Sequence, residues 1–177
     1  MRFNDYIEEA KMMKNTMIGF SVKGSSLSRL FKYIESWLVR YDIKHDKVKD
    51  PHFTIAQITG NYPKDELVRE INNIQKDITF NPKRVRLFRG VNVPKDFIAL
   101  EYKPNDKYVK LFKDISGEFE VRNFPEIRPH ISLFSVEKKG VSDLFFEDIK
   151  QNMPSLPKLK AEDVELWNNK FELEYTK

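Results

Sequence analysis

Apolar residues recur along the chain at two spacings, and these spacings predict an alternation of strands and helices. In the first half, alternating or continuous apolar runs predict strands, whereas apolar positions three and four residues apart predict helices. The predicted strands are 16–24, 52–58 and 83–90, and the predicted helices are 26–42 and 63–77. The first half therefore has the order β, α, β, α, β.

The second half repeats this order. The same spacings predict, in turn, a strand over 97–103, a helix over 105–119, a strand over 130–136, a helix over 142–152 and strands near 160–167 and 170–175. A short amphipathic helix over 3–14 precedes both halves. The repeated order indicates an internal duplication.

Two predicted strands, one in each half, begin with the same frame of residues. The stretch "PHFTIAQI" starts at Pro51 and "PHISLFSV" starts at Pro129, so that His52 and His130 occupy equivalent places. We therefore predict an α+β protein in which residues 1–177 form a single domain. Its first lobe spans about 16–92, and its second spans about 93–177.

The repeated frame places polar side chains together. Because side chains alternate between the faces of a strand, His52 and Thr54 share one face while Phe53 points to the other. His130 and Ser132 are related in the same way. If the halves pack about a pseudo-twofold axis, two imidazoles and two hydroxyls converge across a cleft.

This set of groups suits the cleavage of a phosphodiester by general acid and base catalysis. A neutral imidazole takes one proton while a protonated imidazole gives another to the leaving oxygen, and histidine offers both forms near neutrality. Thr54 and Ser132 are placed to donate hydrogen bonds to the non-bridging phosphoryl oxygens. A neighbouring ribose hydroxyl is a nucleophile already in position, which favours RNA-like linkages and cyclic phosphates as substrates.

Composition narrows the function further. The 31 basic and 27 acidic residues give a net charge of +4, which favours small phosphate-bearing ligands or single-stranded nucleic acid. The absence of cysteine excludes disulfides, thiolate catalysis and cysteine-based zinc sites. Zinc catalysis needs three protein ligands, and the remaining histidine, His45, lies in a polar run, so we expect neither a metal nor another cofactor.

The N-terminal residues contain acidic side chains, which argues against a signal peptide, and no apolar run reaches the length of a membrane span. We therefore expect a cytoplasmic monomer that makes no membrane contact. Nothing in the sequence requires a partner protein.

Four further residues are candidates for substrate binding, each with a structural alternative. Arg128 precedes His130 by two residues and either contacts a phosphate or lies at the solvated rim. Arg86, on the strand 83–90, either lines the cleft or faces solvent. Tyr62, in the loop after the first motif strand, and Trp167, near the C-terminus, either stack on a base or serve packing.

The motifs His52-Phe53-Thr54 and His130-Ile131-Ser132 resemble the hallmark of the 2H phosphoesterase superfamily, which carries one His-x-[Ser/Thr] motif in each half of a duplicated fold. The resemblance spans roughly residues 16–175. It implies two antiparallel sheets lining a central cleft with helices outside. It also implies a metal-independent phosphodiesterase with the two histidines as acid and base.

The resemblance leaves the substrate open. The stretch "RPHISLFSV" is similar to the LigT-type RNA cyclic phosphodiesterases, which implies a role in RNA end processing, although "PHFTIAQITG" lacks the Phe-Leu-Gly ending of their first motif. The opening "MRFNDYIEEAK" is similar in style to small phage proteins. It points to the phage anti-CBASS nucleases, which destroy cyclic oligonucleotides, or to viral enzymes that degrade 2′-5′ oligoadenylate.

We expect hydrolysis of such small nucleotide signals, in the host cytoplasm if the protein is viral, where it counteracts a nucleotide-based antiviral defence. The alternatives are an RNA 2′,3′-cyclic phosphodiesterase, a non-catalytic nucleotide-binding module and an interaction protein with structural histidines.

Overall fold

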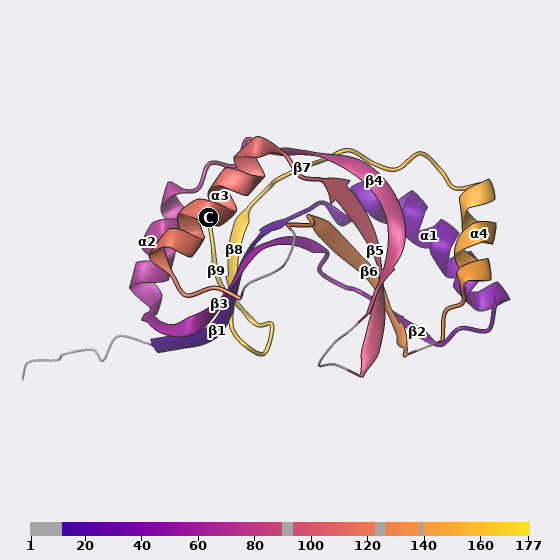
Figure 1. Ribbon diagram of the computed structural model, residues 1–177, viewed down its shortest axis with the longest axis horizontal. Helices are drawn as coiled ribbons and strands as arrows, with labels where there is room; N and C mark the ends of the chain where they lie inside the picture. The colour runs from indigo at the N-terminus through magenta and orange to yellow at the C-terminus, as the bar shows by residue number, and fades with distance from the viewer. Residues whose placement is uncertain (1–11, 90–93, 123–126, 139) are drawn as a thin grey trace, which may run out of the picture.

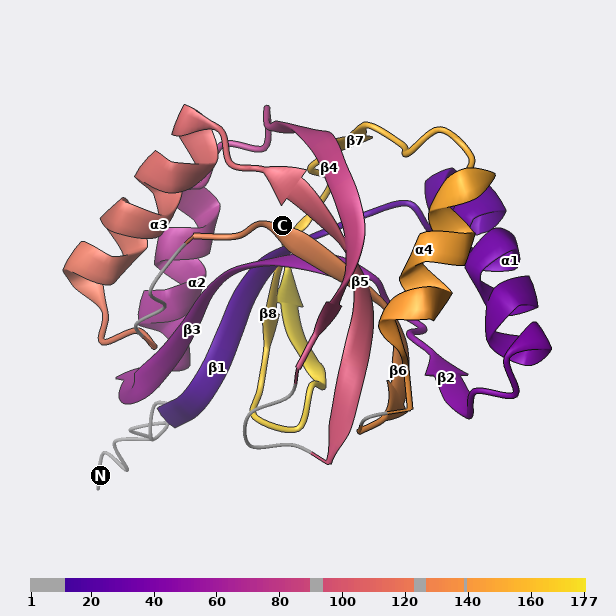
Figure 2. The same cartoon turned by 45° about the vertical axis from the view of Figure 1, so that its right-hand side comes forward.

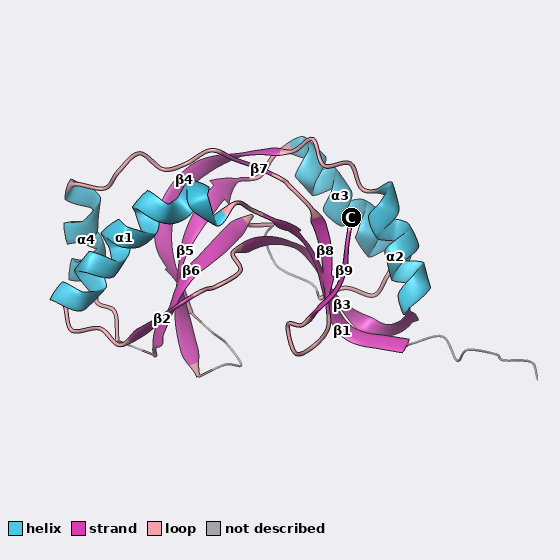
Figure 3. Cartoon of the chain, turned by 180° about the vertical axis from the view of Figure 1, so that it is seen from behind, coloured by secondary structure: helices cyan, strands magenta, loops and turns pink. Residues whose placement is uncertain are grey.

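The computed structural model describes residues 12–89, 94–122, 127–138 and 140–177. Within these ranges the chain forms an arch in which two sheets line the concave side and helices lie on the outer side (Figure 1). The same layers are visible from behind (Figure 3). The α+β fold with two antiparallel sheets and outer helices is confirmed.

The elements follow the predicted order with a few differences. They are β1 Met12–Ser21, α1 Gly24–Arg40, β2 His45–Lys47, β3 His52–Pro63, α2 Lys64–Asn73, β4 Thr79–Phe88, β5 Lys95–Lys103, α3 Asp106–Glu118, β6 His130–Glu137, α4 Asp143–Gln151, β7 Leu159–Lys160, β8 Val164–Trp167 and β9 Leu173–Thr176. No pattern predicted β2, and the strand predicted over 160–167 is divided into β7 and β8. The helix predicted over 3–14 lies mostly outside the described residues, and its last positions, 12–14, belong to β1.

Strand pairing interleaves the two halves of the sequence. The first sheet has the order β3-β1-β8-β9 and the second has the order β2-β6-β5-β4-β7. Strands β8 and β9 thus join the first sheet although they come from the second half, and β4 joins the second sheet although it comes from the first. The two sheets, rather than the sequence segments 16–92 and 93–177, are the structural lobes.

The helices cover the outer faces of these sheets. Helices α2 and α3 lie against the first sheet, whereas α1 and α4 lie together on the second (Figure 2). Each helix is amphipathic; for example, α1 buries Leu27, Phe31, Ile34 and Leu38 on one face. Within the described ranges, no helix is both long and apolar enough to cross a membrane.

The two motif strands have the same backbone irregularity. In the register of β3 with β1, Ile55 is an extra residue without a paired residue in β1. In the register of β6 with β5, Leu133 is likewise an extra residue without a paired residue in β5. Both residues are the third after the motif histidine, and each lies next to a second buried residue. Such a bulge bends the strand locally. The duplication seen in the sequence therefore extends to the strand geometry.

A cluster of buried aromatic rings joins the two sheets. Phe53 of β3 stacks on Phe80 of β4 with a ring centroid separation of 3.7 Å, and Tyr102 of β5 lies 5.0 Å from Phe53. Phe20 and Tyr108 also contact Phe80, at 6.3 and 5.5 Å. Because Phe53 lies between the motif residues 52 and 54, this cluster holds the start of β3 against the second sheet.

We expect Phe80→Ala to lower the free energy of unfolding by about 3–5 kcal/mol, because it leaves a cavity among rings from both sheets. Urea denaturation followed by circular dichroism measures the change. Phe171→Ala is the control, since the Phe171 side chain is 72% exposed, and it should change stability by no more than about 0.5 kcal/mol. A loss below about 1 kcal/mol for Phe80→Ala would contradict the joining role of the cluster.

Candidate active site

Each motif histidine is held by a hydrogen bond to its own chain. Nδ1 of His52 lies 2.9 Å from the carbonyl oxygen of Asp50, and Nδ1 of His130 lies 2.8 Å from that of Arg128. A carbonyl oxygen only accepts, so Nδ1 carries the proton in both rings. When neutral, each imidazole therefore presents an unprotonated Nε2, the nitrogen that can take a proton from a substrate.

An aromatic ring supports each imidazole. The ring of Trp167, on β8, lies 4.8 Å from that of His52 with an interplanar angle of 36°. The ring of Phe88, at the end of β4, stacks on His130 at 4.3 Å and 20°. These contacts limit the orientations of both imidazoles and remove water from one face of each.

The electrostatic environment favours neutral imidazoles. Burial lowers the pKa of His52 below the ordinary value of 6.5, against the effects of its hydrogen bond to Asp50 and of the Asp50 charge. Burial also lowers the pKa of His130, and the charge on His52 lowers it further, whereas Glu101 opposes this shift. A charge on His52, which belongs to the first sheet, therefore disfavours a second charge on His130 of the second sheet.

Thr54 lies on the same face of β3 as His52, and Ser132 lies on the same face of β6 as His130. Thr54 and Ser132 are both half-buried, two residues beyond the motif histidine and before the bulge. Oγ1 of Thr54 lies 3.2 Å from Sδ of Met17, and the Tyr108 hydroxyl donates to the backbone carbonyl of Thr54. Each sheet thus contributes one imidazole and one hydroxyl.

A buried carboxylate lies beside His130. Glu101 pairs with His130 across β5 and β6 and is only 2% exposed. It accepts hydrogen bonds from Lys83 at 3.1 Å, Arg84 at 2.9 Å and Arg86 at 3.5 Å. Burial alone would raise the pKa of Glu101, but the bonds from Arg84 and Lys83 hold this pKa at about 2. Glu101 is therefore ionised and fixes three cations on β4.

These contacts bring Arg86, one of the predicted substrate-binding residues, close to the site. Its guanidinium lies 4.9 Å from the centroid of the Phe88 ring, and that ring stacks on His130. Arg86 is thus joined to the imidazole through one aromatic ring.

The surroundings of two other candidate binding residues agree with the structural alternatives stated for them. Trp167 is only 6% exposed, so its ring supports His52 and offers little surface to a nucleotide base. Arg128 is exposed, and β6 begins at His130, so the strand alternation that would align Arg128 with His130 does not extend to it.

The prediction that Tyr62 contacts the same substrate needs correction. Tyr62 lies within β3, ten residues beyond His52, which corresponds to about 33 Å along an extended strand. Its hydroxyl accepts a hydrogen bond from the Glu120 backbone N–H, and its ring packs on Phe119. Tyr62 therefore serves packing at the far end of the strand.

Comparison with known proteins supports this arrangement at the level of the fold. No family model matches the sequence, and no curated protein matches it. Among solved structures, Kluyveromyces marxianus Usb1 is similar with a TM-score of 0.62 at 10% sequence identity, over 92% of this chain and 97% of that one. E. coli LigT complexed with NADP+ gives a TM-score of 0.57 at 13% identity, over 94% of both chains. The chain has the 2H phosphoesterase fold.

Sequence reasoning missed three residues of this 2H fold that support the histidines: Phe88, Glu101 and Gly19. Arg84, Arg86 and Phe88 are spaced two residues apart on one strand. This spacing indicates that their side chains lie on the same face, and it is the sequence pattern by which Phe88 could be found. Glu101 is the one acidic residue within the apolar run "FIALEY". Gly19 interrupts the strand pattern "TMIGFSV", and an isolated glycine in a strand indicates a close approach.

Gly19 makes room for the support under His52. Strand β1 lies between β3 and β8, so the Trp167 ring must cross β1 to reach His52. A Cβ atom at Gly19 would lie 2.3 Å from the Phe53 carbonyl oxygen and 3.0 Å from Cζ3 of Trp167. Only glycine fits this position without a shift of the backbone or of the ring.

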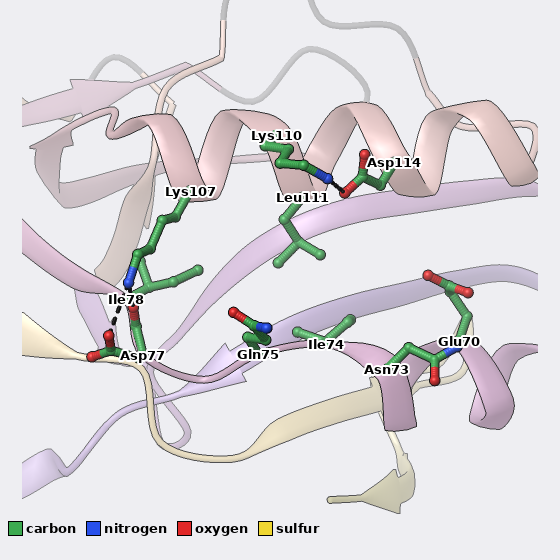
Figure 4. A pocket seen from close by; sticks show the side chains of 10 residues that line it. All are labelled: Glu70, Asn73, Ile74, Gln75, Asp77, Ile78, Lys107, Lys110, Leu111 and Asp114. Carbon is green, nitrogen blue, oxygen red and sulfur yellow. Dashed lines mark hydrogen bonds and ion pairs between the residues drawn. The ribbon is translucent and has the colours of Figure 1, made fainter.

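Other sites of the 2H fold are less suited to this chemistry. The part of the chain that the structure describes contains no group of three His, Cys, Asp or Glu side chains placed to hold a metal ion. A hollow of about 350 Å³ lies between α2 and α3 (Figure 4). It is lined in part by two ion pairs, Lys107 with Asp77 and Lys110 with Asp114, and contains neither motif histidine.

We expect Gly19→Ala to displace the Trp167 ring from His52 and to lower stability by about 1–3 kcal/mol, as overpacking does. The measurements are thermal unfolding and the tryptophan fluorescence spectrum. Gly117→Ala is the matched control, because a Cβ atom there meets nothing within 4 Å and the residue lies in helix α3. The control should be neutral or stabilising. Equal behaviour of the two variants would exclude the close approach at Gly19.

Proposed function

We propose that the protein is a metal-independent phosphodiesterase that acts on small nucleotide substrates through His52 and His130. One observation carries the proposal. The two imidazoles come from different sheets, have the same tautomer, interact electrostatically and are each followed by a hydroxyl residue two positions later. Each chain supplies both histidines, which supports action as a monomer.

The reaction follows from these positions. Nε2 of the neutral imidazole removes a proton from the attacking hydroxyl or water, and the protonated imidazole gives a proton to the leaving oxygen as the P–O bond breaks. Thr54 and Ser132 donate hydrogen bonds to the non-bridging oxygens, where negative charge increases in the transition state. One proton is taken up and one is released, so the pair ends with the same net charge.

We further propose that the substrates are cyclic oligonucleotides or 2′-5′ oligoadenylate, and that their hydrolysis counteracts a nucleotide-based antiviral defence in the host cytoplasm. The net charge of +4 supports an anionic nucleotide substrate. Nucleotides are also the ligands named for the similar structures, namely uridine monophosphate for K. marxianus Usb1, with a TM-score of 0.59, and 3′-AMP for E. coli LigT, with a TM-score of 0.52. The similarity of "RPHISLFSV" to the LigT-type motif supports a second candidate function, the hydrolysis of RNA 2′,3′-cyclic phosphate ends.

The test is an activity screen in the presence of EDTA. Cyclic dinucleotides, 2′-5′ oligoadenylate and RNA with a terminal cyclic phosphate are incubated with the protein, and the terminal phosphate of each product is identified. We expect His52→Ala and His130→Ala each to lower kcat by about 10²- to 10⁴-fold, because each removes one proton-transfer group.

His45→Ala is the matched control for this screen. Nδ1 of His45 also lies close to the carbonyl oxygen two residues before it, at 2.7 Å from that of Ile43. However, His45 pairs with Val136, a buried residue, and so occupies the opposite face of the second sheet from His130. The His45→Ala variant should therefore keep full activity.

Two outcomes of the screen would contradict the proposal. Tight nucleotide binding without turnover would indicate a binding module, and loss of hydrolysis with EDTA would contradict the metal-independent mechanism.

The lowered pKa values of both histidines predict an acidic optimum. A lowered pKa favours the neutral form at pH 7, where the protonated acid is then scarce. As the pH falls, one imidazole takes up a proton, and its charge further lowers the pKa of the other, so the singly protonated pair becomes the main species. We expect a bell-shaped profile of kcat/KM with its maximum below pH 6.5, measured over a range in which circular dichroism shows the folded state. A maximum above pH 7 would contradict this environment.

A further inference from the structure

A basic surface lies along strand β4 of the second sheet. A hollow of about 340 Å³ runs along β4 beside α4, and we call it the edge groove. Four cationic residues line it: Arg84, Arg86, Arg89 and Lys150. Asp143, at the start of α4, is the one acidic residue that lines it.

The cations of the edge groove are only partly neutralised. Arg84 and Arg86 share the single carboxylate of Glu101 with Lys83. Within the described ranges, Arg89 and Lys150 have no carboxylate at ion-pair distance. The groove therefore has an excess of positive charge, and a phosphate bound in it would be held by charge-assisted hydrogen bonds.

Arg86 links the edge groove to the candidate active site. Arg86 lines the groove and also lies over the Phe88 ring, which stacks on His130. Residues 84–88 of β4 pair with β5, whereas β7 pairs with Thr79 and Phe80. In the described part of the chain, no strand lies on the other side of residues 84–88. This open edge separates the face that carries His130 from the groove beside α4.

The length of the groove limits the ligand. Four residues separate Phe88 from Arg84, which corresponds to about 13 Å along the strand. A single nucleotide with its phosphate between the histidines does not reach the far end. A chain of several nucleotides extends far enough to place further phosphates beside the four cations.

We propose that the edge groove binds the phosphates of a linear single-stranded oligonucleotide whose scissile phosphate lies between His52 and His130. The position of the scissile phosphate rests on the proposed function, but binding in the groove requires no turnover. The groove thus selects oligonucleotides over mononucleotides by lowering KM for the longer substrate.

The experiment measures binding to a catalytically silenced protein. Arg89→Ala and Lys150→Ala are combined in the His52→Ala background, and the probe is a fluorescein-labelled RNA of six nucleotides, followed by anisotropy at several NaCl concentrations. We expect Kd to rise about tenfold. We also expect the slope of log K against log salt to become shallower by about 1.4, since each lost phosphate contact on a single strand removes about 0.7.

The matched control is Arg69→Ala combined with Lys113→Ala, which removes the same charge from exposed positions on α2 and α3. It should leave Kd and the salt slope close to those of the parent. With wild-type histidines, the Arg89 and Lys150 substitutions should raise KM for a cleavable oligonucleotide and leave kcat, and both constants for a nucleoside 2′,3′-cyclic monophosphate, unchanged.

The results distinguish failure of the groove proposal from failure of the proposed hydrolytic activity. If the control weakens binding as much as the groove variant does, or if neither weakens it, the groove proposal is wrong even when hydrolysis proceeds. If the groove variant alone weakens RNA binding while the wild-type protein hydrolyses nothing, the proposed activity is wrong and the groove proposal stands.

Discussion

The packing of Phe53 on Phe80 is the contact on which the candidate site depends. It joins the first sheet to the second, and Phe53 lies between His52 and Thr54, so one three-residue stretch supplies both a core contact and two polar groups of the site. Because protein interiors are close-packed, a buried ring has few alternative positions. The position of His52 is therefore set by the core rather than by a loop, which favours a preorganised site.

The two halves of the site are alike in backbone and different in surroundings. Both histidines have the same tautomer, both are supported by an aromatic ring and both precede a bulge. His52 packs on the uncharged ring of Trp167. His130 stacks on Phe88, the Phe88 ring also contacts the Arg86 guanidinium, and Arg86 in turn pairs with Glu101. A duplicated frame thus gives two imidazoles the same geometry but different electrostatic neighbours, as an acid and a base require.

Local patterns predicted most of the helices and strands and the faces of the motif residues, because periodicity depends on residues close in sequence. They did not predict that β8 would lie beside β1, since an apolar pattern shows which face is buried but not what covers it. The support of His52 by Trp167 follows from that pairing and was missed for this reason. The placing of Tyr62 failed because β3 extends through Pro63 rather than ending near residue 58.

The cations of β4 have an ordinary explanation, because charged side chains on an edge strand prevent pairing with the edges of other molecules. That function requires exposed charge and no buried partner. Glu101 is nevertheless buried beneath Lys83, Arg84 and Arg86, and an ionised carboxylate is costly to bury unless several donors satisfy it. Glu101 holds the guanidinium groups in fixed positions beside His130. Protection of an edge strand does not require such fixed positions. Fixed cations next to an imidazole are what the recognition of a phosphate chain requires.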